Sequence, residues 1–155
     1  MAVESQSSSA STPWPALLPL GHHAGKPPIP LNRNVTLVGS RNNAHLHLLS
    51  RSVSKAHALI VVSESGVYIR DLASRTHVLI NNQAIREADL RDGDLLQIGG
   101  FTFRFSAGPS ARRPSRAAGH LPAVLDTDDG QQYVIRERVL LIGRRPTSDL
   151  PLFQE

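Results

Sequence analysis

The sequence predicts an all-β fold, an antiparallel β-sandwich, on three observations. Between residues 27 and 106, short aliphatic runs recur every eight to twelve residues or so, and turn residues end each run. No stretch of this region shows the apolar period of an amphipathic helix. Aromatic residues make up only 5% of the 155 residues, so the core must be aliphatic. Many short strands without helices are typical of two packed sheets.

The first two predicted strands differ in their patterns. Residues 35–38 form a continuous apolar-rich run that ends at Gly39. Residues 44–49 alternate with period two, which places two leucines on one face and two histidines on the other. We therefore expect the leucine face to pack on the core.

The remaining strands follow the same rule. Turn residues separate them, including an Asn81-Asn82 pair, because asparagine tolerates positive φ. The last run carries three phenylalanines on one face, which should close the core. These strands are predicted over residues 58–62, 67–70, 78–80, 95–98 and 101–105.

The flanking segments have a different composition. Residues 1–26 are rich in Ser, Pro, Ala and Gly, so we expect a flexible leader that buries too little surface to offset its ordering entropy. The sandwich domain is predicted over residues 27–106. Residues 107–120 are rich in Pro, Arg, Ser and Ala and are predicted to be a disordered basic linker.

An internal repeat follows the linker. When each residue n is aligned with residue n+104, residues 31–41 match residues 135–145 without a gap, and Leu46 falls on Leu150. Residues 121–155 are therefore predicted to be the N-terminal part of a second, truncated repeat. A third of a sandwich cannot close a core by itself, so we expect the chain to be a fragment of a longer protein.

The repeat opens with a predicted hairpin. Residues 123–125 and 133–135 are apolar and flank an aspartate-rich turn at 126–130. A calcium loop is the alternative for these aspartates, but the segment lacks the distal glutamate that such a loop uses. The hairpin is the favoured interpretation.

Charge and composition restrict the class of partner. The formal net charge of +4 favours anionic partners, but scarce aromatic residues and the lack of a basic helix make nucleic acid unlikely. The chain has no cysteine, which suits a reducing compartment such as the cytoplasm. No apolar run approaches the ~20 residues that a membrane helix needs, so we expect no membrane segment.

The segment from Ser54 to His57 contains the residues that are best suited to bind a ligand. Ser54 and Lys55 offer a hydroxyl and an ammonium group to one oxyanion at the mouth of a strand, and His57 can tie the loop down through its ring nitrogens. No nucleophile is paired with a base, so the pattern indicates recognition rather than an enzyme. A metal hydrolase that uses His45 and His47 is the alternative, but no third ligand lies near them in the sequence.

With these motifs in place, the chain resembles the forkhead-associated (FHA) domain family over about residues 27–106. Six segments carry the resemblance, and they occur in the family's order and at its spacing. They are Val38-Gly39, 53–58, 71–74, 80–82, 90–99 and 101–105. The resemblance implies a sandwich of about eleven strands with no catalytic activity and no cofactor. It implies binding of a phosphothreonine peptide through loops at one end, from a protein in a Ser/Thr kinase pathway.

The resemblance also assigns roles to single residues. The family's phosphate-binding serine falls on Ser54, and the basic residue after it falls on Lys55. Arg75 falls on a second-loop position that often lines the phosphate pocket. His57 falls on a histidine that ties the binding loops together, and Gly39 and Asn81 are expected to support the site structurally.

Two positions depart from the family pattern. Ser40 stands where the family has an arginine after the glycine, and Arg41 comes one residue late, although Arg144 is in frame in the second repeat. Thr76 stands where the family has an asparagine that bonds the peptide main chain. We include Ser40, Arg41 and Thr76 among the expected binding residues. These departures also keep open an alternative function, a phosphate-independent protein-interaction scaffold with a degenerate pocket.

Overall fold

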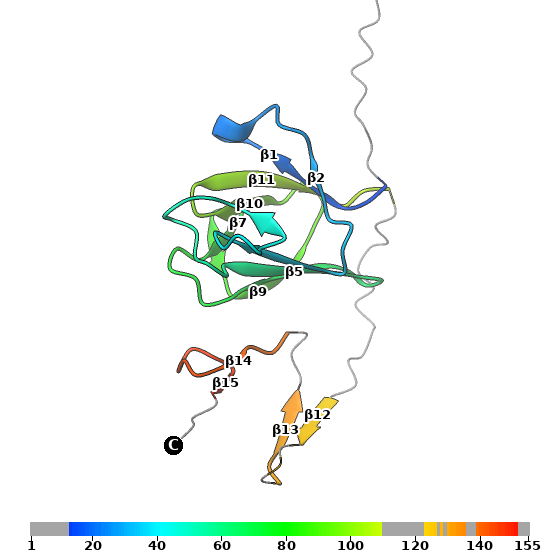
Figure 1. The fold of residues 1–155 in the computed structure, drawn as a ribbon. Coiled ribbons are helices and arrows are strands. Elements are labelled where there is room, and N and C mark those ends of the chain that lie inside the picture. The colour runs from blue at the N-terminus through cyan, green and yellow to red at the C-terminus, as the bar shows by residue number, and fades with distance from the viewer. Residues whose placement is uncertain (1–12, 110–122, 127, 129, 136–138, 152–155) are drawn as a thin grey trace, which may run out of the picture.

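The computed structural model describes residues 13–109, 123–126, 128, 130–135 and 139–151 (Figure 1). Residues 13–109 form a sandwich of a six-stranded and a five-stranded sheet. The first sheet has the order β2 (Ile29–Pro30), β1 (Ala16–Pro19), β11 (Phe101–Ser106), β10 (Leu95–Ile98), β7 (Val78–Ile80) and β8 (Gln83–Ile85). The second has the order β4 (Leu46–His47), β3 (Val35–Gly39), β5 (Ala58–Ser63), β6 (Gly66–Asp71) and β9 (Glu87–Leu90). The predicted fold class is confirmed.

The core lies between the two sheets and is mainly aliphatic, as expected. Val38, Ile60 and Ile69 come from adjacent strands of the second sheet, and all three are fully buried. They belong to the same core cluster as Phe103 and Phe105 of β11. Alternate residues of each strand point inward, so side chains from both sheets fill one layer.

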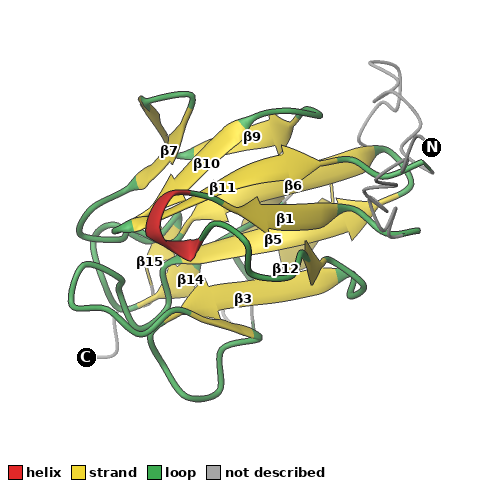
Figure 2. Cartoon of the chain, turned by 90° about the horizontal axis from the view of Figure 1, so that it is seen from above, coloured by secondary structure: helices red, strands yellow, loops and turns green. Residues whose placement is uncertain are grey.

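The N-terminal part of the domain differs from the prediction. Residues 13–26 were expected in a flexible leader, but β1 pairs with β11 over four residues and with β2 on its other side, and Leu17 is fully buried. A single-turn 3-10 helix, Gly21–His23, follows β1 (Figure 2). Composition misled because Pro19 lies beyond the two residues that pair with β2, at an open edge that proline tolerates, while Ala16 and Leu17 supply the buried contacts. Residues 1–12 and the predicted linker from 110 to 120 lie outside the described residues.

Strands β3 and β4 form a parallel pair, with Val38 opposite Leu46. Only two residues of the predicted 44–49 run have strand geometry. The predicted alternation is nevertheless confirmed, because Leu46 and Leu48 are buried while His45 and His47 are exposed. Strands β2, β8 and β9 were not predicted, since they are short and carry few β-branched residues.

The C-terminal part of the described chain contains two strand pairs. Strands β12 (Ala123–Asp126) and β13 (Gln132–Ile135) form the antiparallel hairpin that the sequence predicts. Strands β14 (Ile142–Gly143) and β15 (Leu150–Pro151) pair in parallel. Within the described residues, no helix is both long and apolar enough to cross a membrane.

Candidate functional site

Three loops meet at one end of the sandwich. Strand β3 ends there, β5 begins there, and the β6–β7 loop returns there, because β5 is antiparallel to both β3 and β6 (Figure 2). The N–H of Ser40 donates to the carbonyl of Ser54 at 3.0 Å, and the N–H of Arg41 donates to the carbonyl of Lys55 at 3.3 Å. The candidate residues from the first two loops are therefore neighbours.

Gly39 makes this close approach possible. A Cβ atom at this position would lie 2.1 Å from the carbonyl oxygen of Lys55, far inside van der Waals contact. The obstacle is backbone, which cannot swing away as a flexible side chain does. A glycine is thus required for the end of β3 to lie against the Ser54 loop.

Ser54 also contacts the second loop. Its Oγ accepts a hydrogen bond from the N–H of Arg75 at 3.1 Å. A serine hydroxyl has one donor and two acceptor sites, so this bond uses an acceptor site and leaves the O–H proton available to an oxyanion. The three loops are therefore joined around a hydroxyl that still has its proton to donate.

The buried side chain of His57 joins the Ser54 loop to the β6–β7 loop. The side chain is fully buried, its Nδ1 accepts from the N–H of Ser54 at 3.0 Å, and its Nε2 lies 3.2 Å from the carbonyl of His77. Since Nδ1 accepts and a carbonyl cannot donate, the ring must be neutral with its proton on Nε2. Burial lowers the pKa of His57 below 6.5, and this effect outweighs the opposing bond to His77 and the charge of Asp71.

Stability should therefore depend on pH through His57. Above about pH 6.5 the ring is neutral in both states, and below it the unfolded chain binds a proton that the folded chain resists. We expect the free energy of unfolding to fall as the pH drops from 7.5 towards the lowered pKa. Urea titrations at several pH values should show a steeper decline for the wild type than for His57→Gln, which has no titratable group. Parallel lines for the two proteins would contradict this prediction.

A buried carboxylate shapes the second loop. Asp71 accepts from the N–H of Ser74 at 2.8 Å, from its Oγ at 2.6 Å, and from the N–H of Val78 at 2.8 Å. The loop contains two residues in the left-handed region, Ala73 with φ 55° and His77 with φ 59°. Non-glycine residues are uncommon there. The carboxylate therefore holds a loop conformation that these residues would not adopt readily.

The side chains of Arg75 and Thr76 face the Ser54 loop. Nη2 of Arg75 donates to the carbonyl of Arg51 at 3.4 Å, and Oγ1 of Thr76 donates to the carbonyl of Ser52 at 2.8 Å. Because the Thr76 proton is used in this bond, its hydroxyl can only accept from a ligand. It can receive a peptide N–H but cannot donate to a phosphate.

Four exposed cations lie on these loops: Arg41, Arg51, Lys55 and Arg75. We call them the cationic rim. The described residues form three ion pairs, all of which involve Arg70 or Arg86, so no carboxylate in this part of the chain pairs with the rim. Sequence reasoning missed Arg51, although its position three residues before Ser54 in the same loop was a usable signal.

Arg41 lies outside the strand. Strand β3 ends at Gly39, and the carbonyl of Arg41 accepts from the N–H of Ala44 at 2.9 Å in the turn that follows. The alternation of side chains along a strand therefore does not apply to this residue. Its guanidinium is not forced onto the face opposite the pocket.

Asn81 lies away from the three loops. It follows β7, its φ is 50°, and its side chain bonds Asp94 at 2.9 Å and the N–H of Leu95 at 3.0 Å. These contacts join the β7–β8 turn to the start of β10. Asn81 thus supports the sheet that carries the second loop and does not itself contact the site loops.

The two histidines of the alternative metal site bond the backbone instead. Nδ1 of His45 accepts from the N–H of Leu37 at 2.9 Å, and Nε2 of His47 lies 3.2 Å from the carbonyl of Ser40. Among the described residues, no group of three or more His, Cys, Asp or Glu side chains is placed to hold a metal ion. His47 instead helps to position the loop that follows β3.

A β-sandwich whose end loops present a hydroxyl and four cations has the architecture of a binding module. Comparison with known families identifies the module: residues 36–99 match the FHA domain family, and the solved structures similar to this chain include FHA domains. Residues 36–99 thus match an FHA domain, as the resemblance in the sequence indicated.

This chain aligns with only part of the length of its curated relatives. The transcriptional regulatory protein EmbR of Mycobacterium tuberculosis is 38% identical over 82 residues, which are 51% of this chain and 21% of EmbR. A structure of M. tuberculosis EmbR in complex with a low-affinity phosphopeptide aligns with a TM-score of 0.59 and 27% identity, over 68% of this chain and 27% of that one. A structure from work on phosphothreonine-dependent FHA domain interactions aligns with a TM-score of 0.56 and 22% identity, over 61% of this chain and 97% of that one. The chain spans about a fifth of the length of the curated relatives it matches.

Proposed function

We propose that this domain binds a phosphothreonine-containing segment of another protein and performs no catalysis. The observation that carries the proposal is the Ser54 hydroxyl, whose proton is free to donate and whose neighbouring loops carry the cationic rim, which forms no ion pair among the described residues. A phosphothreonine brings a charge of about −1.5 to −2 and three acceptor oxygens. Ser54 and Lys55 supply a donor and a charge for these oxygens, and Arg75 supplies a second charge from the adjoining loop.

Similar structures support the choice of ligand. One holds a phosphopeptide and another belongs to work on phosphothreonine-dependent interactions of FHA domains. A ligand of this kind is made by a Ser/Thr kinase, so we place the protein in a kinase pathway. We propose the cytoplasm as its compartment, in keeping with a chain that has no cysteine.

A titration with matched peptides tests this function. We expect a phosphothreonine peptide selected from a library to bind with a Kd below about 1 mM, and its unphosphorylated form to bind at least about tenfold more weakly. The affinity should also fall as salt increases, because the cationic rim is exposed. The proposal would be overturned if the two peptides bound equally, or if no selected peptide had a Kd below about 1 mM.

A second candidate function rests on Ser40 and Thr76. Neither residue offers the arginine or asparagine contact of the family, and the Thr76 proton is already bonded to Ser52. The domain would then be a phosphate-independent scaffold that binds partners through another surface. The double variant Ser54→Ala/Lys55→Ala distinguishes the two, because a scaffold would retain its partner and a phosphopeptide reader would lose it.

A further inference from the structure

The two strand pairs of the C-terminal repeat reproduce the first four strands of the domain in order. Strands β1–β2 and β12–β13 are antiparallel pairs, and β3–β4 and β14–β15 are parallel pairs. The register of the parallel pairs is identical after the shift of 104, since Val38 opposite Leu46 becomes Ile142 opposite Leu150. For the parallel pair, the sequence repeat therefore corresponds to a repeat of strand pairing, whereas the hairpin repeats only the antiparallel type of pairing.

Hydrogen bonds repeat as well. The bond from Ala44 N–H to the Arg41 carbonyl recurs as the bond from Ser148 N–H to the Arg145 carbonyl, both at 2.9 Å. The imidazole of His45 accepts the N–H of Leu37 at 2.9 Å, and at the shifted positions the carboxylate of Asp149 accepts the N–H of Leu141 at 2.9 Å. Asp149 thus has the local role of His45, with a negative charge in place of a ring.

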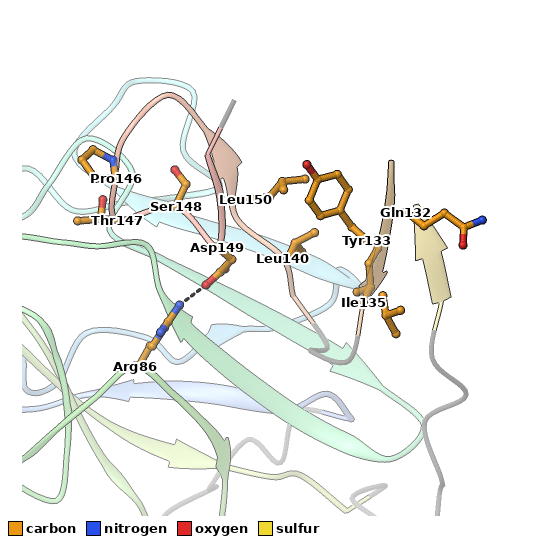
Figure 3. A pocket seen from close by; sticks show the side chains of 11 residues that line it. Arg86, Gln132, Tyr133, Ile135, Leu140, Pro146, Thr147, Ser148, Asp149 and Leu150 are labelled. Atoms are coloured by element: carbon orange, nitrogen blue, oxygen red, sulfur yellow. Dashed lines mark hydrogen bonds and ion pairs between the residues drawn. The ribbon is translucent and has the colours of Figure 1, made fainter. Parts of the chain in front are cut away.

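Asp149 makes additional contacts that His45 does not. One carboxylate oxygen accepts from Nη2 of Arg70 and the other from Nη2 of Arg86, both in the first domain (Figure 3 shows the Arg86 contact). Arg70 lies on β6, has only 2% of its surface exposed, and also donates to Glu87 at 2.6 Å. The Asp149 side chain is 10% exposed. Its pKa is lowered, because the bond from Leu141 and the two guanidinium groups outweigh the opposing effect of burial.

The docked repeat also reaches the site loops. A cleft of about 370 Å³ is lined on one side by Leu141 and Thr147 of the repeat and on the other by Ala73 and His77 of the β6–β7 loop. Arg70 and Arg86 line the same cleft. The β14–β15 loop, which corresponds to the loop after β3, therefore lies next to a loop of the phosphopeptide site.

The larger cleft beside Asp149 is lined mainly by residues of the repeat. It has a volume of about 770 Å³ and is lined by Arg86 and by residues of the repeat that include Ile135 and Leu150 (Figure 3). Their counterparts at the shifted positions, Leu31 and Leu46, belong to the core of the first sandwich. This cleft is therefore interior space of the repeat, and we do not assign a ligand to it.

We propose that residues 123–151 are the opening part of a second FHA-like unit that is docked on the first, and that Asp149 is the residue that latches it. The docking surface is the outer side of β6 and β9 with Arg70 and Arg86, and its occupant is the β14–β15 segment of the same chain. The latch holds the β14–β15 loop beside the β6–β7 loop. This interface is independent of whether the Ser54 site binds phosphothreonine.

Hydrogen exchange of the full chain tests the interface. Arg86 is the residue to change, because its side chain is 69% exposed and the variant keeps the bond between Asp149 and Leu141. We expect Arg86→Glu to speed amide exchange in residues 139–151 by about tenfold or more, since it places a repelling charge on the carboxylate. The matched control is Arg104→Glu, an equal change of charge on an exposed residue of the other sheet.

A second variant, on the other side of the ion pair, tests whether faster exchange comes from loss of the pair or from the new glutamate at position 86. Asp149→Asn removes the charge but retains an oxygen that can accept from Leu141, and it should also release residues 139–151. Unchanged exchange in β5 and β6 shows that the sandwich remains folded. The proposal is overturned if residues 139–151 exchange equally fast in the wild type and in both variants. Phosphopeptide affinity, measured in parallel with Ser54→Ala, reports separately on the proposed function.

Discussion

Replacing Ser54 by alanine should reduce the affinity for a phosphothreonine peptide by roughly ten- to a hundredfold. The variant removes a charge-assisted hydrogen bond, which contributes about 1.5–3 kcal/mol. It also removes the acceptor for the Arg75 N–H, so the β6–β7 loop loses one of its contacts with the β4–β5 loop, while those from Arg75 to Arg51 and from Thr76 to Ser52 remain. Isothermal titration calorimetry with the phosphorylated and unphosphorylated forms of one peptide measures the effect. The loss should be confined to the phosphorylated form.

Ser63→Ala is the matched control for this substitution. Ser63 lies at the opposite end of β5, in the exposed β5–β6 turn, where its hydroxyl bonds Ser65 and Gly66. The same chemical change there should leave both affinities unaltered. If Ser54→Ala and Ser63→Ala bind the phosphopeptide equally well, the hydroxyl of Ser54 does not contact phosphate.

Gly39→Ala should destabilise the domain by about 3 kcal/mol or more. The new Cβ would overlap the carbonyl of Lys55, and the overlap can be relieved only by moving β3 away from the Ser54 loop. That movement breaks the backbone bonds from Ser40 and Arg41 to the carbonyls of Ser54 and Lys55. Urea-induced unfolding, followed by Trp14 fluorescence or circular dichroism, gives the difference in free energy.

Gly100→Ala provides the comparison within the same protein. Its added Cβ would meet only Oγ of Ser52 at 3.8 Å, which is ordinary contact, and its backbone is not in the left-handed region. We expect a change between zero and a gain of about 1 kcal/mol, since alanine restricts the unfolded chain. Equal stability of the two alanine variants would show that the Gly39 backbone adjusts without cost.

Much of the sandwich could be predicted because its inner strands carry strong local signals. In the hairpin of β5 and β6, aliphatic residues lie on both sides of a Ser-Gly turn, and in β11 two phenylalanines alternate with polar residues and fill the core. The short edge strands could not be predicted in the same way. Strand β8 consists of Gln83–Ile85, whose strand conformation depends on pairing with β7 rather than on local preference.

The site was predictable at the level of residues but not of contacts. Sequence placed Ser54, Lys55 and Arg75 together only through the family pattern, since they come from two loops about twenty positions apart. It could not show that the Thr76 proton is used by the Ser52 carbonyl, or that Asn81 bonds Asp94. Such bonds depend on the three-dimensional path of the loops, which short sequence windows do not encode.

The position of β1 has a practical consequence for work on the isolated domain. A protein trimmed to begin at residue 27, where the change of composition suggests a boundary, would lack a strand that lies between β2 and β11. The backbone of β11 would then be an open edge next to the hole left by Leu17, and such edges recruit strands from other molecules. Samples cut there should aggregate, so a useful boundary lies before Pro15, whose carbonyl already bonds Leu31.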